Sequence, residues 1–153
     1  MTPRLYFDTS VFGGVFDEEF KEYSLPLFES VVLKEYILLF SSLTQEELNG
    51  APDKVKEYFN NIEASNIEIV ESSEKAIELA SEYIAANVVG KTSFADCLHI
   101  ALATISEADY LISWNFKHIV NVFRIEGYNS VNVKLGYKEL EIRSPRDFVK
   151  YEE

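Results

Sequence analysis

The 153-residue sequence predicts an α/β fold in which a mostly parallel central sheet is covered by helices on both faces. One reason is the alternation of short apolar runs with longer amphipathic segments, which is typical of β–α–β units. Another is that the chain has no repeat, low-complexity tract or linker-like stretch. Hydrophobic residues make up 47% of the chain, enough for a substantial core, so we expect one domain over residues 1–153.

Strands are expected where short apolar runs occur, at 4–8, 36–41, 67–70 and 110–113, with a last edge strand at 139–143. Helices are expected between them, at 25–35, 43–49, 53–64, 74–87, 93–106 and 116–123. Pro26 would lie in the first turn of the first helix, where proline is tolerated. Gly50 and Pro52 separate the second helix from the third. The helix at 93–106 is apolar almost all round, so it is predicted to be buried.

The composition limits the classes of function. A net charge of −12 argues against a general electrostatic grip on nucleic acid, and it suits a divalent metal site, a basic partner or plain solubility. The single Cys97 cannot form an internal disulfide, which favours a reducing, cytoplasmic location. The residues after Met1 do not form a signal peptide, and Lys34 and Glu35 interrupt the longest apolar stretch. We therefore expect no membrane segment.

Four polar residues interrupt the apolar pattern: Asp8, Glu47 next to Glu46, Asp96 and Asn115. Three of them have an ordinary alternative role. Glu47 and Asp96 each complete a capping-box pattern, at 44–47 and 93–96, and Asn115 is a common turn residue. Asp8 has the weakest alternative, because no helix clearly starts after it. An uncompensated charge at the end of a buried strand is unfavourable.

The predicted topology brings these four residues to one edge of the sheet. Asp8 and Asn115 follow strands, whereas Glu47 and Asp96 lie in helices whose beginnings are expected where the strands end. Open α/β sheets bind ligands at that edge. Three carboxylates and an amide would repel one another without a cation, and oxygen donors without a Cys or His cluster suit Mg²⁺ or Mn²⁺. Such an ion can activate water and stabilise charge on a phosphodiester.

Four segments in this order, YFDTSVFGG, EELNGA, FADCLHIALA and ADYLISWN, resemble the motifs of PIN domains. PIN domains are metal-dependent ribonucleases that include the VapC-type toxins of toxin–antitoxin pairs. The resemblance covers residues 4–125 and depends on the order and spacing of the acids. It implies a PIN-like three-layer sandwich that cuts RNA with Mg²⁺ or Mn²⁺, a small antitoxin partner and a homodimer.

Residue by residue, Asp8, Glu47 and Asp96 match the three acids of the PIN pattern and are expected to bind the metal. Glu47 fits better than Glu46, because Leu follows it. Many members carry a fourth acid where this chain has Asn115, whose amide oxygen would assist as a neutral group. This departure keeps open a second interpretation, a degenerate PIN-like module that binds RNA or protein without cleavage. A haloacid-dehalogenase-type phosphatase would need a second Asp where this chain has Ser10.

Five neighbouring residues are candidates for supporting the acids or contacting substrate. Thr9 and Ser10 would donate hydrogen bonds, unless they only form a turn. His99 shares a helical face with Asp96 and would steer it or touch substrate, the alternative being a satisfied buried histidine. Ser113 ends a strand towards the same pocket, and His118 would contact RNA. The nearest cations for phosphates, with solvated surface as their ordinary role, are Lys91, Lys117 and Arg124.

Overall fold

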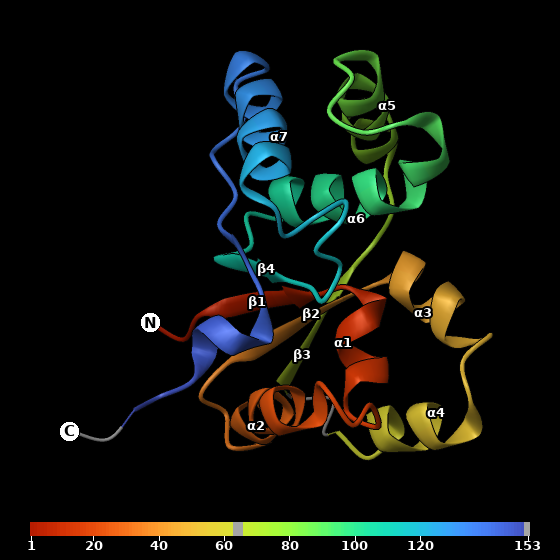
Figure 1. Ribbon diagram of the computed structural model, residues 1–153, viewed down its shortest axis with the longest axis vertical. Coiled ribbons are helices and arrows are strands. Elements are labelled where there is room, and N and C mark those ends of the chain that lie inside the picture. The colour runs from red at the N-terminus through yellow and green to blue at the C-terminus, as the bar shows by residue number, and fades with distance from the viewer. Residues whose placement is uncertain (63–65, 152–153) are drawn as a thin grey trace.

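A computed structural model describes residues 1–62 and 66–151 and contains a five-stranded parallel sheet in the order β3-β2-β1-β4-β5 (Figure 1). The strands are β1 (Arg4–Phe7), β2 (Ile37–Ser41), β3 (Ile67–Val70), β4 (Tyr110–Ile112) and β5 (Ile142–Arg143). The helices are α1 (Thr9–Gly14), α2 (Lys21–Val32), α3 (Ser42–Leu48), α4 (Asp53–Asn60), α5 (Glu74–Ala85), α6 (Phe94–Ile105) and α7 (Val122–Lys134), with the 3-10 turns η2 (Lys91–Ser93) and η3 (Pro145–Phe148). No helix within the described residues is long and apolar enough to cross a membrane.

The sheet is the middle of three layers, as predicted. Side chains of a strand alternate between its two faces. Leu5 and Phe7 of β1 belong to a core cluster with α1, α2 and α4, whereas Tyr6 belongs to a second cluster with α5, α6 and α7. Figure 1 shows these two groups of helices on opposite sides of the sheet. Because both faces of β1 are covered, any polar group at its end lies close to the centre of the molecule.

The chain turns into a helix directly after β1, where the sequence predicts no helix start. Asp8 is the N-cap of α1, and its Oδ1 accepts a hydrogen bond from the Ser10 amide. Gly14 ends α1 at a close approach: a Cβ there would lie 2.6 Å from Ser24 Oγ and 2.7 Å from Trp114 Nε1. Packing of α1 against α2 and the segment after β4 therefore requires glycine.

The first long helix begins earlier than predicted. It starts at Lys21 and ends at Val32, so Pro26 lies inside it and not in its first turn. Proline removes one intrahelical hydrogen bond, which normally disfavours a helix interior. Packing outweighs this loss, because Leu27 and Phe28, directly after the proline, are buried against the sheet. Lys34, with φ of 63°, is the left-handed residue that ends the helical path.

The helix expected at 116–123 is wrong. Residues 116–121 form turns, in which the carbonyl of Asn115 accepts hydrogen bonds from the amides of Ile119 and Val120, and only 122–123 are helical, as the start of α7. The helix of this region is α7, capped by the side chain of Asn121. The buried Asn132 of α7 accepts a hydrogen bond from the Tyr83 hydroxyl. Because polar residues lie on the inward face of α7, this helix lacks the apolar periodicity by which helices are predicted. Other predicted ends shift slightly, and the expected end at 64 lies outside the described residues.

The strand order reverses between β1 and β4. From β1 the chain goes to β2 and β3 on one side, and β4 and β5 lie on the other side. Ligand sites of open α/β sheets lie at the carboxyl ends of the strands at such a reversal. Asp8 follows β1 there and Ser113 follows β4, so the topology places both in the expected position.

Candidate active site

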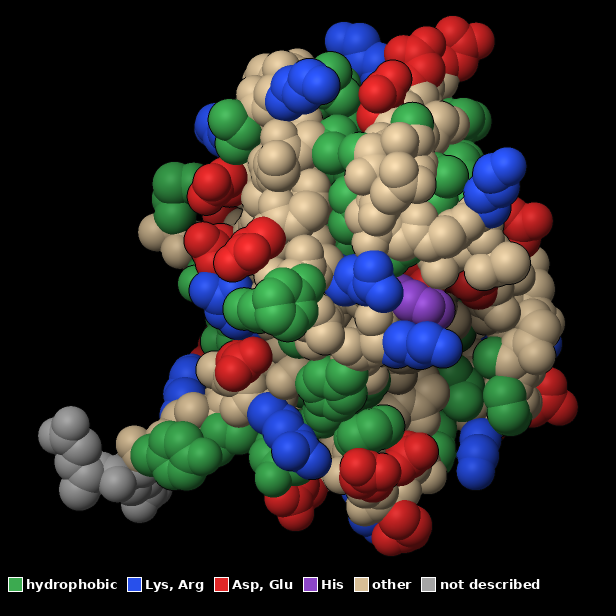
Figure 2. Space-filling model, turned by 45° about the horizontal axis from the view of Figure 1, so that its top comes forward, with side chains coloured by type: hydrophobic (Ala, Val, Ile, Leu, Met, Phe, Trp, Pro, Cys, Tyr) green, Lys and Arg blue, Asp and Glu red, His purple; other side chains and the backbone are tan. Residues whose placement is uncertain are grey.

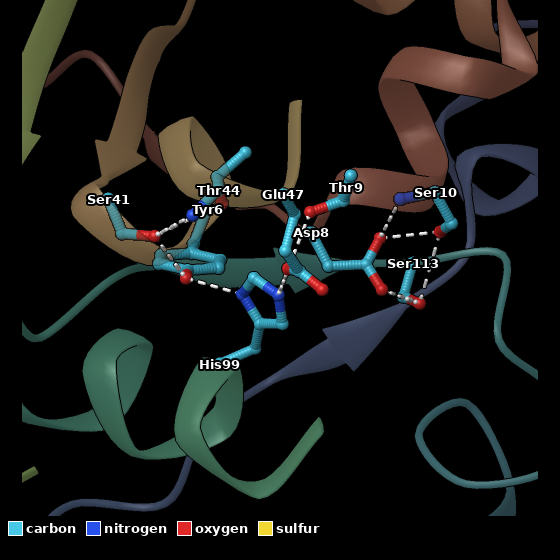
Figure 3. Close-up of polar contacts among 9 residues, drawn as sticks. All are labelled: Tyr6, Asp8, Thr9, Ser10, Ser41, Thr44, Glu47, His99 and Ser113. Carbon is cyan, nitrogen blue, oxygen red and sulfur yellow. Dashed lines mark hydrogen bonds and ion pairs between the residues drawn. The ribbon is translucent and has the colours of Figure 1, made fainter. Parts of the chain in front are cut away.

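Asp8 is held rigidly at the strand-order reversal. Its side chain is buried, with the residue only 5% exposed. Oδ1 accepts hydrogen bonds from the amide and the hydroxyl of Ser10 (3.1 and 2.5 Å), and Oδ2 accepts one from the Ser113 hydroxyl (2.6 Å) (Figure 3). Both carboxylate oxygens are thus fixed, one from α1 and one from the end of β4.

The two serines tie Asp8 to the segment after β4. Ser10 Oγ accepts a hydrogen bond from the amide of Trp114 (2.9 Å), and Ser113 Oγ accepts one from the amide of Asn115 (2.9 Å). Each hydroxyl therefore donates to Asp8 and accepts from the backbone. The side chains of Ser10 and Ser113 therefore both contact the carboxylate of Asp8.

The environment disfavours a negative charge on Asp8. Burial is the largest cause that raises the pKa of Asp8, and the negative charge of Asp96 raises it further. His99 and the hydroxyls of Ser10 and Ser113 act in the opposite direction. A carboxylate that is buried, hydrogen-bonded and still disfavoured as an anion is a group that a nearby cation would stabilise.

Glu47 of α3 lies at the same edge of the sheet, and its side chain is partly exposed. Its Oε1 accepts hydrogen bonds from His99 Nε2 (2.5 Å) and Thr9 Oγ1 (2.8 Å), and among the described residues Oε2 has no such partner. The hydrogen bond from His99 lowers the pKa of Glu47. The capping alternative for Glu47 is not observed, because Ser41 caps α3 and Glu47 lies near the end of that helix.

A series of hydrogen-bonded, buried polar side chains lies behind Glu47. His99 Nδ1 lies 2.6 Å from the Tyr6 hydroxyl, which lies 2.8 Å from Ser41 Oγ, and Ser41 also bonds to Thr44 (Figure 3). His99 is therefore a buried histidine that steers Glu47; the structure shows no hydrogen bond from it to Asp96. Tyr6, Ser41 and Thr44 were not identified from the sequence. The sequence signal for Tyr6 was its position in β1 just before Phe7 and Asp8, because alternation along the strand places its side chain on the face opposite to that of Phe7.

Asp96 lies in the first turn of α6 and faces His118. Its Oδ2 is 3.4 Å from His118 Nδ1, and both side chains are partly exposed. The capping alternative is not observed here either, because Ser93 makes no side-chain cap hydrogen bond. Burial raises the pKa of Asp96, as does the negative charge of Glu47, whereas His118 and His99 oppose the shift.

Asn115 takes part in the turn after β4. Its side-chain oxygen accepts a hydrogen bond from the His118 amide (2.9 Å). It thereby holds His118 in the position from which the imidazole reaches Asp96. This is the turn role that the sequence left open for Asn115.

The three acids lie at one edge and influence one another, but each is paired with a protein group. Asp96 raises the pKa of Asp8, and Glu47 raises that of Asp96. Within residues 1–62 and 66–151, no three His, Cys, Asp or Glu side chains converge closely enough to hold an ion. The three side chains offer carboxylate oxygens, the ligand type that Mg²⁺ and Mn²⁺ prefer, but in this structure they are turned to their protein partners and do not converge on one point.

A family model described as PIN domain matches residues 5–115. The chain belongs to the PIN domain family. The match contains Asp8, Glu47, Asp96 and Asn115, all four acidic or amide positions singled out above. It therefore confirms the resemblance that the sequence motifs indicated.

This PIN domain has the fold of several solved structures. It is similar to a chain of VapBC2 from Rickettsia felis bound to a promoter DNA fragment, with 15% identity, a TM-score of 0.57 and coverage of 92% of this chain and 98% of the other. A chain of DNA-bound VapBC from Salmonella typhimurium has the same identity and TM-score, with coverage of 94% and 98%. Tyrosyl-tRNA synthetase from Aeropyrum pernix matches at 10% identity and a TM-score of 0.50, over 94% of this chain and 53% of the other. No curated protein matches the sequence.

Proposed function

We propose that this PIN domain is a Mg²⁺- or Mn²⁺-dependent endoribonuclease that hydrolyses RNA phosphodiester bonds. One observation carries the proposal. Asp8 is a buried carboxylate at the strand-order reversal, fixed by three hydrogen bonds, and Asp96 lies close enough to raise its pKa. Holding two mutually repelling acids close together, one of them buried, is unfavourable for the fold alone. The same arrangement becomes favourable when a cation binds to both acids.

Asp8, Glu47 and Asp96 would hold the metal, and because their side chains do not converge in this structure, binding would require them to move together. The bound ion would supply a Lewis acid and lower the pKa of water. The other residues keep these acids in place. Ser10 and Ser113 fix Asp8, and Thr9 and His99 engage one oxygen of Glu47, so that the other oxygen is available. Such hydrogen bonds behind ligands commonly decide metal affinity.

His118 and Asn115 have roles on the substrate side of this proposal. His118 is partly exposed beside Asp96, where it would contact the RNA. Asn115 would act by holding the turn that carries His118, and as a neutral oxygen near the acids.

We further propose that the protein is the toxin of a toxin–antitoxin pair, with a small antitoxin partner. The similarity in fold to chains of two VapBC complexes supports this. The homodimer, the cytoplasmic location and the folding of residues 1–153 as one domain stay predictions. Co-expression with the product of a short neighbouring reading frame, followed by co-purification, would test the antitoxin.

The assay for the function uses the purified chain and a set of labelled RNAs. We expect cleavage in the presence of Mn²⁺ or Mg²⁺ and none with excess EDTA, because the acids require the cation to act on the phosphodiester. Restoring Mn²⁺ after EDTA should restore cleavage. Equal cleavage with and without EDTA would exclude the metal mechanism.

A second candidate is a PIN-like module that binds RNA or protein without cutting. It is favoured by Asn115 at the position of a fourth acid and by the pairing of each acid with a protein group. The same assay separates the candidates. A non-cutting module would leave every RNA intact with Mn²⁺ and would still bind its partner.

A further inference from the structure

Tyr6 places a polar group inside the core between the sheet and α6. Its side chain is fully buried, in the cluster that β1 forms with α5, α6 and α7. The ring packs edge-on against the imidazole of His99, with the ring centroids 5.7 Å apart. Burying a hydroxyl is unfavourable unless it is hydrogen-bonded, and phenylalanine would fill the same space without one. Packing alone therefore does not explain the hydroxyl of Tyr6.

The hydrogen bonds of this hydroxyl form a line that ends at Glu47 (Figure 3). The Tyr6 oxygen lies 2.8 Å from Ser41 Oγ and 2.6 Å from His99 Nδ1. On the other side of the imidazole ring, His99 Nε2 lies 2.5 Å from Glu47 Oε1. Ser41 Oγ accepts a hydrogen bond from the amide of Thr44 at the start of α3, so the Ser41 hydroxyl can donate its own proton to the Tyr6 oxygen.

The types of group in this line restrict the direction of its hydrogen bonds. A carboxylate only accepts, so the proton between His99 and Glu47 belongs to Nε2. In a neutral imidazole Nδ1 then has no proton and must accept, and the Tyr6 hydroxyl is its hydrogen-bond partner among the described residues. The opposite tautomer would place two acceptors, Nε2 and Glu47 Oε1, 2.5 Å apart. An imidazolium would place a charge on a residue that is 3% exposed, which is unfavourable.

We infer that Tyr6 is a positioning residue, whose hydroxyl donates to His99 Nδ1, fixes the ring as the Nε2–H tautomer and thereby holds Glu47. The nitrogen of a histidine that carries the proton is set by the hydrogen bond that the other nitrogen makes. The inference rests on the proposed function for the role of Glu47 as a metal ligand. It adds a residue that would touch neither metal nor substrate. Because His99 and Thr9 both engage Oε1, the line from Tyr6 decides which oxygen of Glu47 faces the site.

The tautomer can be measured in the metal-free, wild-type chain. Nitrogen NMR of histidine-labelled protein in EDTA reports two rings, because the chain has two histidines. His118 is partly exposed and His99 is buried, and Figure 2 shows histidine at the surface between Lys and Arg side chains. The His118→Gln variant assigns the signals. We expect a neutral Nε2–H ring for His99, with an Nε2 proton that exchanges slowly with water. An imidazolium, an Nδ1–H ring or a mixture of tautomers would overturn the inference.

Tyr6→Phe removes the hydroxyl and keeps the ring that packs against His99. In EDTA this variant should show both neutral tautomers, and the Nε2 proton should exchange about tenfold faster, as expected for the loss of one hydrogen bond. The matched control is Tyr83→Phe, because Tyr83 is also fully buried and donates to Asn132, away from the acids. Both variants lose a buried hydroxyl, so a purely structural role predicts the same His99 signals in both. The wild-type spectrum keeps the inference falsifiable if Tyr6→Phe does not fold.

Calorimetry with Mn²⁺ connects Tyr6 to the acids. Tyr6→Phe should bind Mn²⁺ about tenfold more weakly than wild type, because hydrogen bonds behind a ligand commonly change metal affinity by this factor or more. Tyr83→Phe should bind as wild type does. Wild-type affinity of Tyr6→Phe would overturn the inference and leave the proposed metal site standing. Absence of Mn²⁺ binding in all three proteins would reject the proposed function, and the tautomer and proton exchange measured in EDTA would then decide the inference.

Discussion

Asp8→Asn should reduce Mn²⁺-dependent RNA cleavage by about 100-fold or more, because charge stabilisation by a bound metal is worth several kcal/mol and each 1.36 kcal/mol is tenfold in rate. Asn keeps the size of the side chain and is an equally good N-cap, so the Ser10 amide retains its acceptor. The measurement compares initial cleavage rates of the two proteins. Asp109→Asn is the control, because Asp109 bonds to the Arg4 amide at the opposite edge of the sheet.

The same substitution should not weaken the metal-free fold at neutral pH. The pKa of Asp8 is raised in the folded state, so between its ordinary and its raised value the folded protein binds more protons than the unfolded chain. The contribution of Asp8 to stability is therefore most favourable at low pH and falls as pH rises through that window. Asn removes the buried charge, and the variant should melt at the wild-type temperature or higher in EDTA. Robust cleavage by a folded Asp8→Asn protein would remove Asp8 from the mechanism.

Asp96→Asn should abolish most of the stabilisation that Mn²⁺ gives the wild-type chain. A ligand at 100 times its dissociation constant stabilises the folded state by about 2.7 kcal/mol, which is about 5–10 °C for a chain of this size. In EDTA the variant should melt at the same temperature or higher, because it removes one of the charges that raise the pKa of Asp8. Melting curves of both proteins, with EDTA and with saturating Mn²⁺, give both quantities.

The opposite pattern would show that Asp96 is structural. Loss of a helix cap lowers stability by about 0.5–2 kcal/mol whether or not metal is present. The structure argues against this, because the side chain of Ser93 makes no cap hydrogen bond and Asp96 faces His118. A variant that melts lower in EDTA and keeps the full Mn²⁺ shift would place the metal elsewhere.

The sheet and its edge were predictable because they follow from strong local signals. Apolar runs such as 37–41 are confirmed as strands, and parallel topology then places Asp8 and Ser113 side by side without further assumptions. The buried character of α6 followed from its apolar circumference. The strands and the buried helix follow from hydrophobic periodicity, and the parallel arrangement follows from the fixed handedness of β–α–β connections. Both depend on short stretches of sequence.

The contacts within the site were not predictable, because they depend on packing between distant segments. Tyr6 and His99 are 93 residues apart in the chain, and no local pattern says that their side chains meet behind Glu47. Gly14, at the end of α1, is required by Trp114, and α7 packs through the buried Asn132. Tertiary contacts outweighed local preference in these places.

A titration of Mn²⁺ into the protein by calorimetry tests the metal site most directly. Glu47→Gln and the adjacent exposed Glu46→Gln form a matched pair, because they remove the same charge one residue apart on α3. We predict that wild type and Glu46→Gln bind Mn²⁺ equally and that Glu47→Gln binds at least about tenfold more weakly, as expected for the loss of a charged oxygen near a cation. Equal affinity of Glu47→Gln and wild type would show that the carboxylate held by His99 and Thr9 does not bind the metal.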